Sequence, residues 1–271
     1  MMPSPPDKQL QPTPALRIAV VLGAGGSGRD LLERVLPLLG DERDVEMQGV
    51  FIEEAEIRYA AELPFVQELC RVTFNVREFT SDQFERTLAL RVRTARRALE
   101  LLASRAGIRH SFRNVRGNAL SLLRETAESS DDTVFEPARL LATGSSAGIR
   151  RRNIVAVVTD PVSACAVVRV ALRLAGGREE MVSVVLLPAP GVSASDLDES
   201  IREVLNGRPV QTRLAGGGGA PAVAEVSRKL GASMLVLPAS AGWLEPAALS
   251  RLRVELRCPI CLVRRWQGGG E

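Results

Sequence analysis

The hydrophobic positions along the chain follow two alternating patterns. Short runs of β-branched and aliphatic residues, such as residues 154–158, indicate buried strands, and longer stretches with apolar residues three or four apart indicate helices. At residues 153–176 a strand pattern is followed by a helix pattern, with only a short break at Asp160-Pro161 between them. Residues 17–40 show the same pattern without a gap, 136 positions earlier, so that Ile18 corresponds to Ile154 and Gly40 to Gly176. The sequence therefore predicts two copies of one α/β unit.

Both copies continue with alternating strands and helices. The first has predicted strands at 18–22, 45–52, 110–115 and 133–135, and helices at 29–39, 80–107 and 120–127. The second has predicted strands at 154–158, 181–187, 210–214, 233–237 and 259–263, and helices starting at 163 and spanning 195–205, 222–230 and 246–256. Such alternation predicts parallel sheets covered by helices on both faces. Only 17 residues separate 135 from 153, too few for a fifth strand and its helix in the first copy.

The first copy carries an insertion between its second and third strands. The spacing between corresponding residues is 136 at the first strands but 101 near the fourth strands, where Pro137 corresponds to Pro238. The first copy therefore has about 35 more residues than the second between its second and third strands. The insertion comprises residues 58–70, predicted to be a loop with short helical pieces, and the helix at 80–107 with a capping box at 80–83. The apolar stripe of that helix, from Phe84 to Leu102, should lie on the sheet or on another helix.

Length and composition fit a two-domain globular protein. We predict a Pro-rich tail at 1–15, domains at 16–140 and 153–266 joined by a linker at 141–152, and a tail at 267–271. The first tail lacks the apolar core of a signal peptide, and no apolar run approaches the roughly 20 residues that cross a bilayer, so we expect a cytoplasmic protein without membrane contact. A formal net charge of +3 does not require nucleic acid, and the arginines at 91–97 and 150–152 are expected to be solvated.

Several segments resemble a known family. These are GVFIEEAEIRYAAELPFVQEL at 49–69, FRNVRGN at 112–118, GASMLVLP at 231–238 and CPICLVRR at 258–265, in that order around the duplicated unit. Outside the tails, nearly the whole chain resembles a tandem universal stress protein. The resemblance implies two Rossmann-like domains of the adenine nucleotide alpha hydrolase type with strand order 3-2-1-4-5, the first lacking its fifth strand. It also implies either an ATP-binding or a non-nucleotide subclass.

The ATP-binding members resemble one another in an aspartate after the first strand and in G-x2-G-x9-G-[ST] after the fourth. Asp160 stands at the aspartate position in the second copy, whereas the first copy has Ala24 there. Ser240 and Gly242 lie near the expected phosphate loop and, with Asp160, are candidate nucleotide contacts.

Prolines replace part of that motif. Pro238 stands at the first glycine, Ala241 at the second, and Pro246-Ala247 at the final pair. Phosphate sites of this type use main-chain N–H groups at a turn and a helix N-terminus, and proline has none. The sequence therefore predicts that ATP does not bind in the usual mode.

A second glycine motif offers an alternative. Gly23, Gly25 and Gly28 fit G-x-G-x-x-G between a strand and a helix, and Glu53-Glu54 ends the next strand, as in a dinucleotide site. A tight strand-to-helix turn explains the same glycines. Binding of ATP, ADP or AMP at this loop or at Asp160 stays open, with NAD less favoured.

No set of catalytic or metal-binding residues stands out. Cys258 and Cys261 are three apart in a predicted strand, so their side chains should point to opposite faces and share no metal; all four cysteines are expected to be reduced. His110 is the single histidine. The pairs at 53–54 and 131–132 are expected to be solvated strand ends.

We therefore expect a non-catalytic protein that acts in stress response or regulation through contacts with an unidentified protein partner. The alternative is a nucleotide-binding sensor or enzyme that uses the loop at 23–28 or the cleft at Asp160. We also expect a homodimer, formed through the edge strand at 259–263.

Overall fold

The first half of the chain forms four parallel strands. The computed structural model describes residues 15–23, 28–40, 44–63, 67–69, 76–78, 81–138 and 153–264. The strands are β1 (Leu16–Gly23), β2 (Val45–Glu54), β5 (Arg109–Gly117) and β6 (Asp132–Phe135), in the order β5-β2-β1-β6. Counted within this half, the order is 3-2-1-4.

The second half forms five parallel strands in the related order. They are β7 (Asn153–Val158), β8 (Val182–Leu186), β9 (Gln211–Leu214), β10 (Ala232–Pro238) and β11 (Ile260–Val263), arranged as β11-β10-β7-β8-β9. Counted within this half, the order is 3-2-1-4-5. The α/β fold class predicted from the sequence is therefore confirmed.

The two halves share one nine-stranded sheet, which corrects the expectation of two separate sheets. β11 lies antiparallel to β6, from Ile260 opposite Phe135 to Val263 opposite Asp132. β11 thus fills the place that a fifth strand of the first half would take. It has β10 on one side and β6 on the other, so the predicted free edge at 259–263 is wrong. An unpaired edge leaves main-chain groups without partners, and here the chain pairs them internally.

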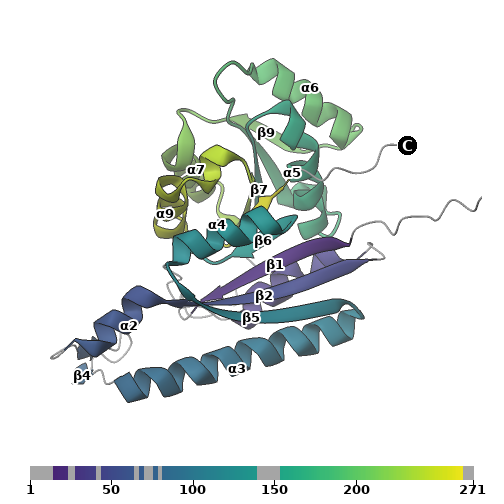
Figure 1. Ribbon diagram of the computed structural model, residues 1–271. Helices are drawn as coiled ribbons and strands as arrows, with labels where there is room; N and C mark the ends of the chain where they lie inside the picture. Colours follow the sequence, from purple (N-terminus) through teal and green to yellow (C-terminus); the bar gives the residue numbers. More distant parts are fainter. Residues whose placement is uncertain are drawn as a thin grey trace, which may run out of the picture.

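Helices cover both faces of the sheet (Figure 1). On one face lie α1 (Gly28–Val35), α3 (Ser81–Ala106), α5 (Pro161–Leu174) and α6 (Ala194–Leu205). The 3-10 helices Leu36–Leu39 and Glu179–Met181 contribute apolar residues to the same face. On the other lie α4 (Ala119–Ser129), α7 (Gly219–Lys229), α8 (Ala241–Leu244) and α9 (Pro246–Glu255). None of the helices in the described part of the chain is long and apolar enough to cross a bilayer.

The predicted long helix packs as its apolar stripe requires. Leu88, Ala95, Leu99 and Ala103 are its buried residues, and they face β2, β5 and α1. Gly49 in β2 permits the close approach, because a Cβ there would lie 2.8 Å from Leu99 Cδ2. Thr80 of the predicted capping box lies outside the described residues.

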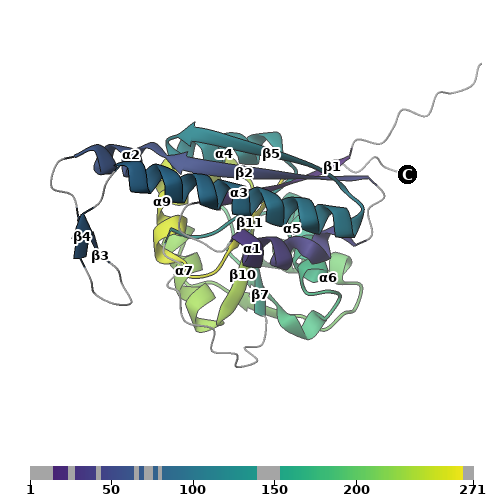
Figure 2. The same cartoon turned by 90° about the horizontal axis from the view of Figure 1, so that it is seen from below.

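The start of the insertion contains more regular structure than predicted. α2 (Ala55–Glu62) continues directly from β2, and β3 (Gln67–Leu69) pairs antiparallel with β4 (Val76–Glu78). Figure 2 shows α2 and this hairpin standing away from the body of the protein, beside one end of α3. We call α2, β3 and β4 the arm.

Candidate functional site

A small cavity lies at the carboxyl ends of β1, β2 and β6. In open α/β sheets, ligands bind outside the carboxyl ends of the strands, at the point where the strand order reverses. The cavity has a volume of about 180 Å³, below the roughly 300–1,000 Å³ of typical ligand pockets. Its wall is mostly apolar. The charged side chains lining it are Glu54, Glu136 and Arg253.

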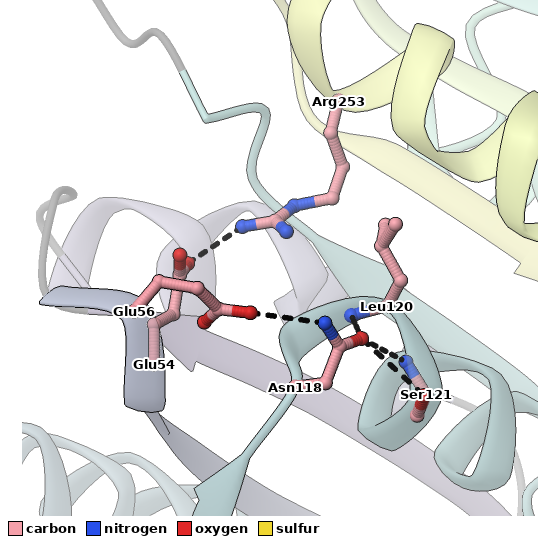
Figure 3. A network of polar contacts seen from close by, with 6 residues as sticks. All are labelled: Glu54, Glu56, Asn118, Leu120, Ser121 and Arg253. Carbon is pink, nitrogen blue, oxygen red and sulfur yellow. Dashed lines mark hydrogen bonds and ion pairs between the residues drawn. The ribbon is translucent and has the colours of Figure 1, made fainter. Parts of the chain in front are cut away.

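An ion pair crosses between the two halves at this cavity. Arg253 in α9 donates to Glu54 Oε1 over 2.7 Å, and the two side chains are only 19% and 28% exposed (Figure 3). The main chain is joined nearby, because the Ala138 N–H donates to the Arg253 carbonyl. Glu54 is therefore not the solvated strand end expected from the sequence.

The neighbouring carboxylates are also paired within the protein. Glu53, whose side chain is 12% exposed, accepts from Asn114 Nδ2 at 2.6 Å and from Arg116 Nε at 3.2 Å. Glu56 accepts from Asn118, whose own Oδ1 caps α4 (Figure 3). A dinucleotide site needs an acidic side chain free to receive ribose hydroxyls. The geometry of Glu53 and Glu54 does not favour that role.

Glu136 is a cavity residue that the sequence reasoning missed. Burial and the nearby Asp30 raise its pKa to about 7, although Arg34 acts in the opposite direction. It is therefore a carboxyl group that titrates near neutral pH. A charged residue directly after the buried strand β6 was the signal that could have identified it.

The glycine motif at the start of α1 is explained at least in part by packing. Gly23 ends β1 and lines the cavity, with no atom within 4 Å of an added Cβ. A Cβ on Gly28 would lie 3.2 Å from Leu22 Cδ2, so this glycine allows α1 to pack closely against β1. Gly25 lies outside the described residues.

Asp160 serves the helix that follows it. As N-cap of α5, its Oδ1 accepts from the Ser163 N–H at 2.8 Å, and its Oδ2 accepts from Ser163 Oγ at 2.6 Å and Thr159 Oγ1 at 3.1 Å. Burial alone would raise the pKa of Asp160, but the hydrogen bonds outweigh it and lower the pKa. Both carboxylate oxygens are engaged.

The segment that corresponds to a phosphate loop has lost half of its amide donors. Five of the ten positions at 238–247 have no main-chain N–H available: two are prolines, and three already donate within the fold. The prolines are Pro238 and Pro246; the donors are Ala239 to Val263, and Trp243 and Leu244 to Ser240. Ser240 and Gly242 are exposed at the start of α8, and the Ser240 side chain makes no capping hydrogen bond.

Comparisons with known proteins find similarity to solved structures in backbone arrangement. No protein-family profile and no curated protein matches the chain. A universal stress protein from Archaeoglobus fulgidus DSM 4304 is 13% identical, with 91% of this chain and 96% of that one covered and a TM-score of 0.47.

Two further solved structures are similar over most of the chain. One, described as a universal stress protein from Pseudomonas aeruginosa UCBPP-PA14, is 12% identical, covers 92% and 93% of the two chains and has a TM-score of 0.43. The other is the cytoplasmic domain of a prokaryotic cation chloride cotransporter, with 12% identity, coverage of 92% and 96%, and a TM-score of 0.43.

The cysteines and the histidine are the remaining candidates from the sequence. Cys258 and Cys261 belong to apolar clusters on opposite faces of the sheet, as predicted. Burial raises the pKa of Cys258 to about 11, and burial and the nearby Asp132 raise that of Cys261 further above its usual value. Within the described residues, no group of three or more His, Cys, Asp or Glu side chains could hold a metal ion. His110 is exposed.

The pair at 131–132 corrects another expectation. Asp132 is only 4% exposed, and Asp131 accepts from the Arg17 N–H at 2.9 Å. Burial, followed by repulsion from Asp131, raises the pKa of Asp132 to about 7, with Arg173 opposing. Asp132 is buried in β6 where β11 pairs with that strand, a contact that the sequence did not predict.

Proposed function

We propose that this protein is non-catalytic, acts in stress response or regulation through contacts with other proteins, and does not bind ATP in the usual mode. The observation that supports this most directly is the shortage of amide donors at 238–247. A triphosphate is held by several converging N–H groups, and each donor that is missing or already engaged removes a hydrogen bond to a charged group.

The carboxyl ends of the first strands in the two halves support the same proposal. In the second half, both oxygens of Asp160 are engaged by Thr159 and Ser163, so a nucleotide would have to compete with a helix cap. In the first half, the pair of Arg253 with Glu54 lies at a cavity too small for a whole nucleotide.

The experiment is native mass spectrometry of the purified protein, followed by thermal unfolding with ATP, ADP, AMP and NAD at millimolar concentration. We expect no co-purified nucleotide and no stabilisation. A retained nucleotide, or a rise of several degrees in Tm, would overturn the proposal, since a ligand that binds only the folded state raises stability. Arg253→Ala serves as the comparison. If a nucleotide stabilises this variant but not the wild type, the ion pair with Glu54 is what keeps nucleotides out of the cavity in the first half.

A sensor for a small ligand is the second candidate. It is favoured by the cavity itself, where Glu136, with its pKa of about 7, lies among apolar side chains. If it is correct, the same thermal scan with adenine, which is smaller than a nucleotide, should show a Tm shift that changes between pH 6 and pH 8.

Homodimer formation is also a proposal. A second copy that extends the sheet would have to add at β5 or β9, the outer strands of the nine-stranded sheet. Light scattering at micromolar concentration tests it, and a monomer would exclude it.

A further inference from the structure

We propose that the outer face of α3 is a docking surface for an acidic amphipathic helix of another protein. We define this face by the exposed residues Arg86, Leu90, Arg93, Arg97 and Leu101. The inference rests on the proposed function, because it names the kind of partner through which the protein acts.

The helix is longer than its structural task requires. α3 has 26 residues, whereas α6, which crosses between the corresponding strands of the second half, has 12. At about 1.5 Å per residue, the difference adds roughly 20 Å of helix. Figures 1 and 2 show α3 running along the outside of the protein.

Two leucines lie on this face apart from the core. Leu90 is 60% exposed and Leu101 is 53% exposed, whereas Leu99 on the sheet side is fully buried. Eleven residues correspond to three helical turns and about 20°, so Leu90 and Leu101 lie in line, with Arg97 between them. A partner helix uses anchors at this kind of spacing.

In the described part of the chain, exposed large hydrophobic residues are concentrated in the arm and α3. Six of the ten large hydrophobic residues that are exposed in the described chain lie between residues 55 and 106. Besides Leu90 and Leu101 they are Ile57, Tyr59, Leu63 and Val76, all in the arm or directly after α2. Arg58 of the arm is ion-paired with Glu85 of α3, so the arm adjoins the N-terminal part of this helix.

Charge identifies the occupant. α3 contains six arginines and three acidic residues, a net charge of +3 that equals the formal net charge of the whole chain. Arg86, Arg91, Arg97 and Arg105 have no ion pair with the residues that the structure describes. A second copy would set arginine against arginine, and nucleic acid would leave the leucines without an apolar partner. An acidic helix with leucine or a similar residue at helical spacing satisfies both the charge and the apolar positions.

The test uses a fluorescein-labelled, helix-forming peptide with leucines at i, i+4, i+7 and i+11 and glutamates at its other exposed positions. We expect it to bind the full-length protein in fluorescence anisotropy. The double variant Leu90→Ser/Leu101→Ser should bind at least tenfold more weakly. Arg86→Glu/Arg97→Glu should lose the acidic peptide and bind a version with lysine for glutamate. The matched controls are Leu214→Ser and Arg251→Glu, exposed residues elsewhere, which should bind as the wild type does.

Three results would overturn the proposal: no binding of the acidic peptide, binding unchanged in both α3 variants, or tighter binding of a DNA duplex of matched charge. Thermal unfolding of each variant checks that it is folded. The outcome is separable from the nucleotide experiment, because loss of peptide binding says nothing of the clefts, and nucleotide binding would contradict the proposed function whatever the peptide does.

Discussion

Arg253 in α9 and Glu54 at the end of β2 lie 199 residues apart in the sequence, yet the guanidinium donates to the carboxylate over 2.7 Å. The pair connects the two halves of the sheet at a second place beside the β6–β11 pairing, and it lies in the wall of the cavity. One contact thus contributes both to the joining of the halves and to the closure of the strand-end cleft.

Replacement of Arg253 by Met should lower the free energy of unfolding by about 1–3 kcal/mol, because it leaves the half-buried Glu54 carboxylate without its partner. Urea denaturation measures this loss. The double variant Glu54→Gln/Arg253→Met should lose less than the sum of the two single variants, because the two side chains interact directly. Arg251→Met, an exposed position on the same helix, is the control and should change stability by less than about 0.5 kcal/mol. Additive losses would show that the pair contributes nothing.

Replacement of Asp132 by Asn should flatten the dependence of stability on pH. Burial raises the pKa of Asp132 from 3.8 to about 7, so the folded state binds a proton that the unfolded state releases near pH 4. The stability from this proton is complete below about pH 4 and is lost as the pH rises to about 7, in all by roughly 2–4 kcal/mol. Urea denaturation from pH 4 to 8 should therefore show a smaller decline in the variant.

The groups around Asp132 define the controls. Asp131 and Arg173 act on its pKa with opposite signs, and Cys261 lies beside it. Glu136 titrates over the same range, so Asp132→Asn/Glu136→Gln should have the flattest profile. Asp198→Asn, at a surface pair in α6, should keep the wild-type profile. An unchanged decline in Asp132→Asn would contradict the assignment.

Introduction of a methyl group at Gly49 should separate α3 from the sheet. An added Cβ would lie 2.8 Å from Leu99 Cδ2 and 3.0 Å from the Phe112 ring, and both side chains would have to move. We expect Gly49→Ala to cost about 1–3 kcal/mol in thermal or urea unfolding. Gly23→Ala is the matched control, because its Cβ meets nothing within 4 Å, and it should be nearly neutral. Equal stability of the two variants would be inconsistent with this packing.

Thiol labelling should separate the cysteines by burial. Because the pKa of Cys258 is raised to about 11 and that of Cys261 is also raised, neither forms much thiolate at pH 8, and both lie within the core. Mass mapping after iodoacetamide treatment of the native protein should find both unmodified, with Cys165, which is partly exposed, labelled before either of them. Both core thiols should react after unfolding in urea. Rapid labelling of Cys258 or Cys261 in the native state would contradict their burial.

Most elements could be predicted from the sequence because their signals are local. The apolar runs of β1, β7 and β10 and the stripe of α3 follow from spacing alone. The sequence predicted only short helical pieces within a loop at 58–70 and did not delimit α2, because residues 55–62 bury little apolar surface and show no clear period; Ala61 is the buried residue of this helix. The sequence named Asp160, Ser240 and Gly242 as candidate nucleotide contacts, but only the three-dimensional contacts show that Asp160 is engaged in capping α5.

The sequence by itself determined the duplicated strand–helix pattern, the order of elements and the prolines at 238 and 246, because each depends on neighbouring residues and on the covalent absence of an N–H. Only the tertiary structure decided that β11 joins β6, that Arg253 reaches Glu54, and that Asp132 and Glu136 are carboxyl groups with a raised pKa. These features depend on which distant segments meet and exclude water, and no local pattern of residues specifies that.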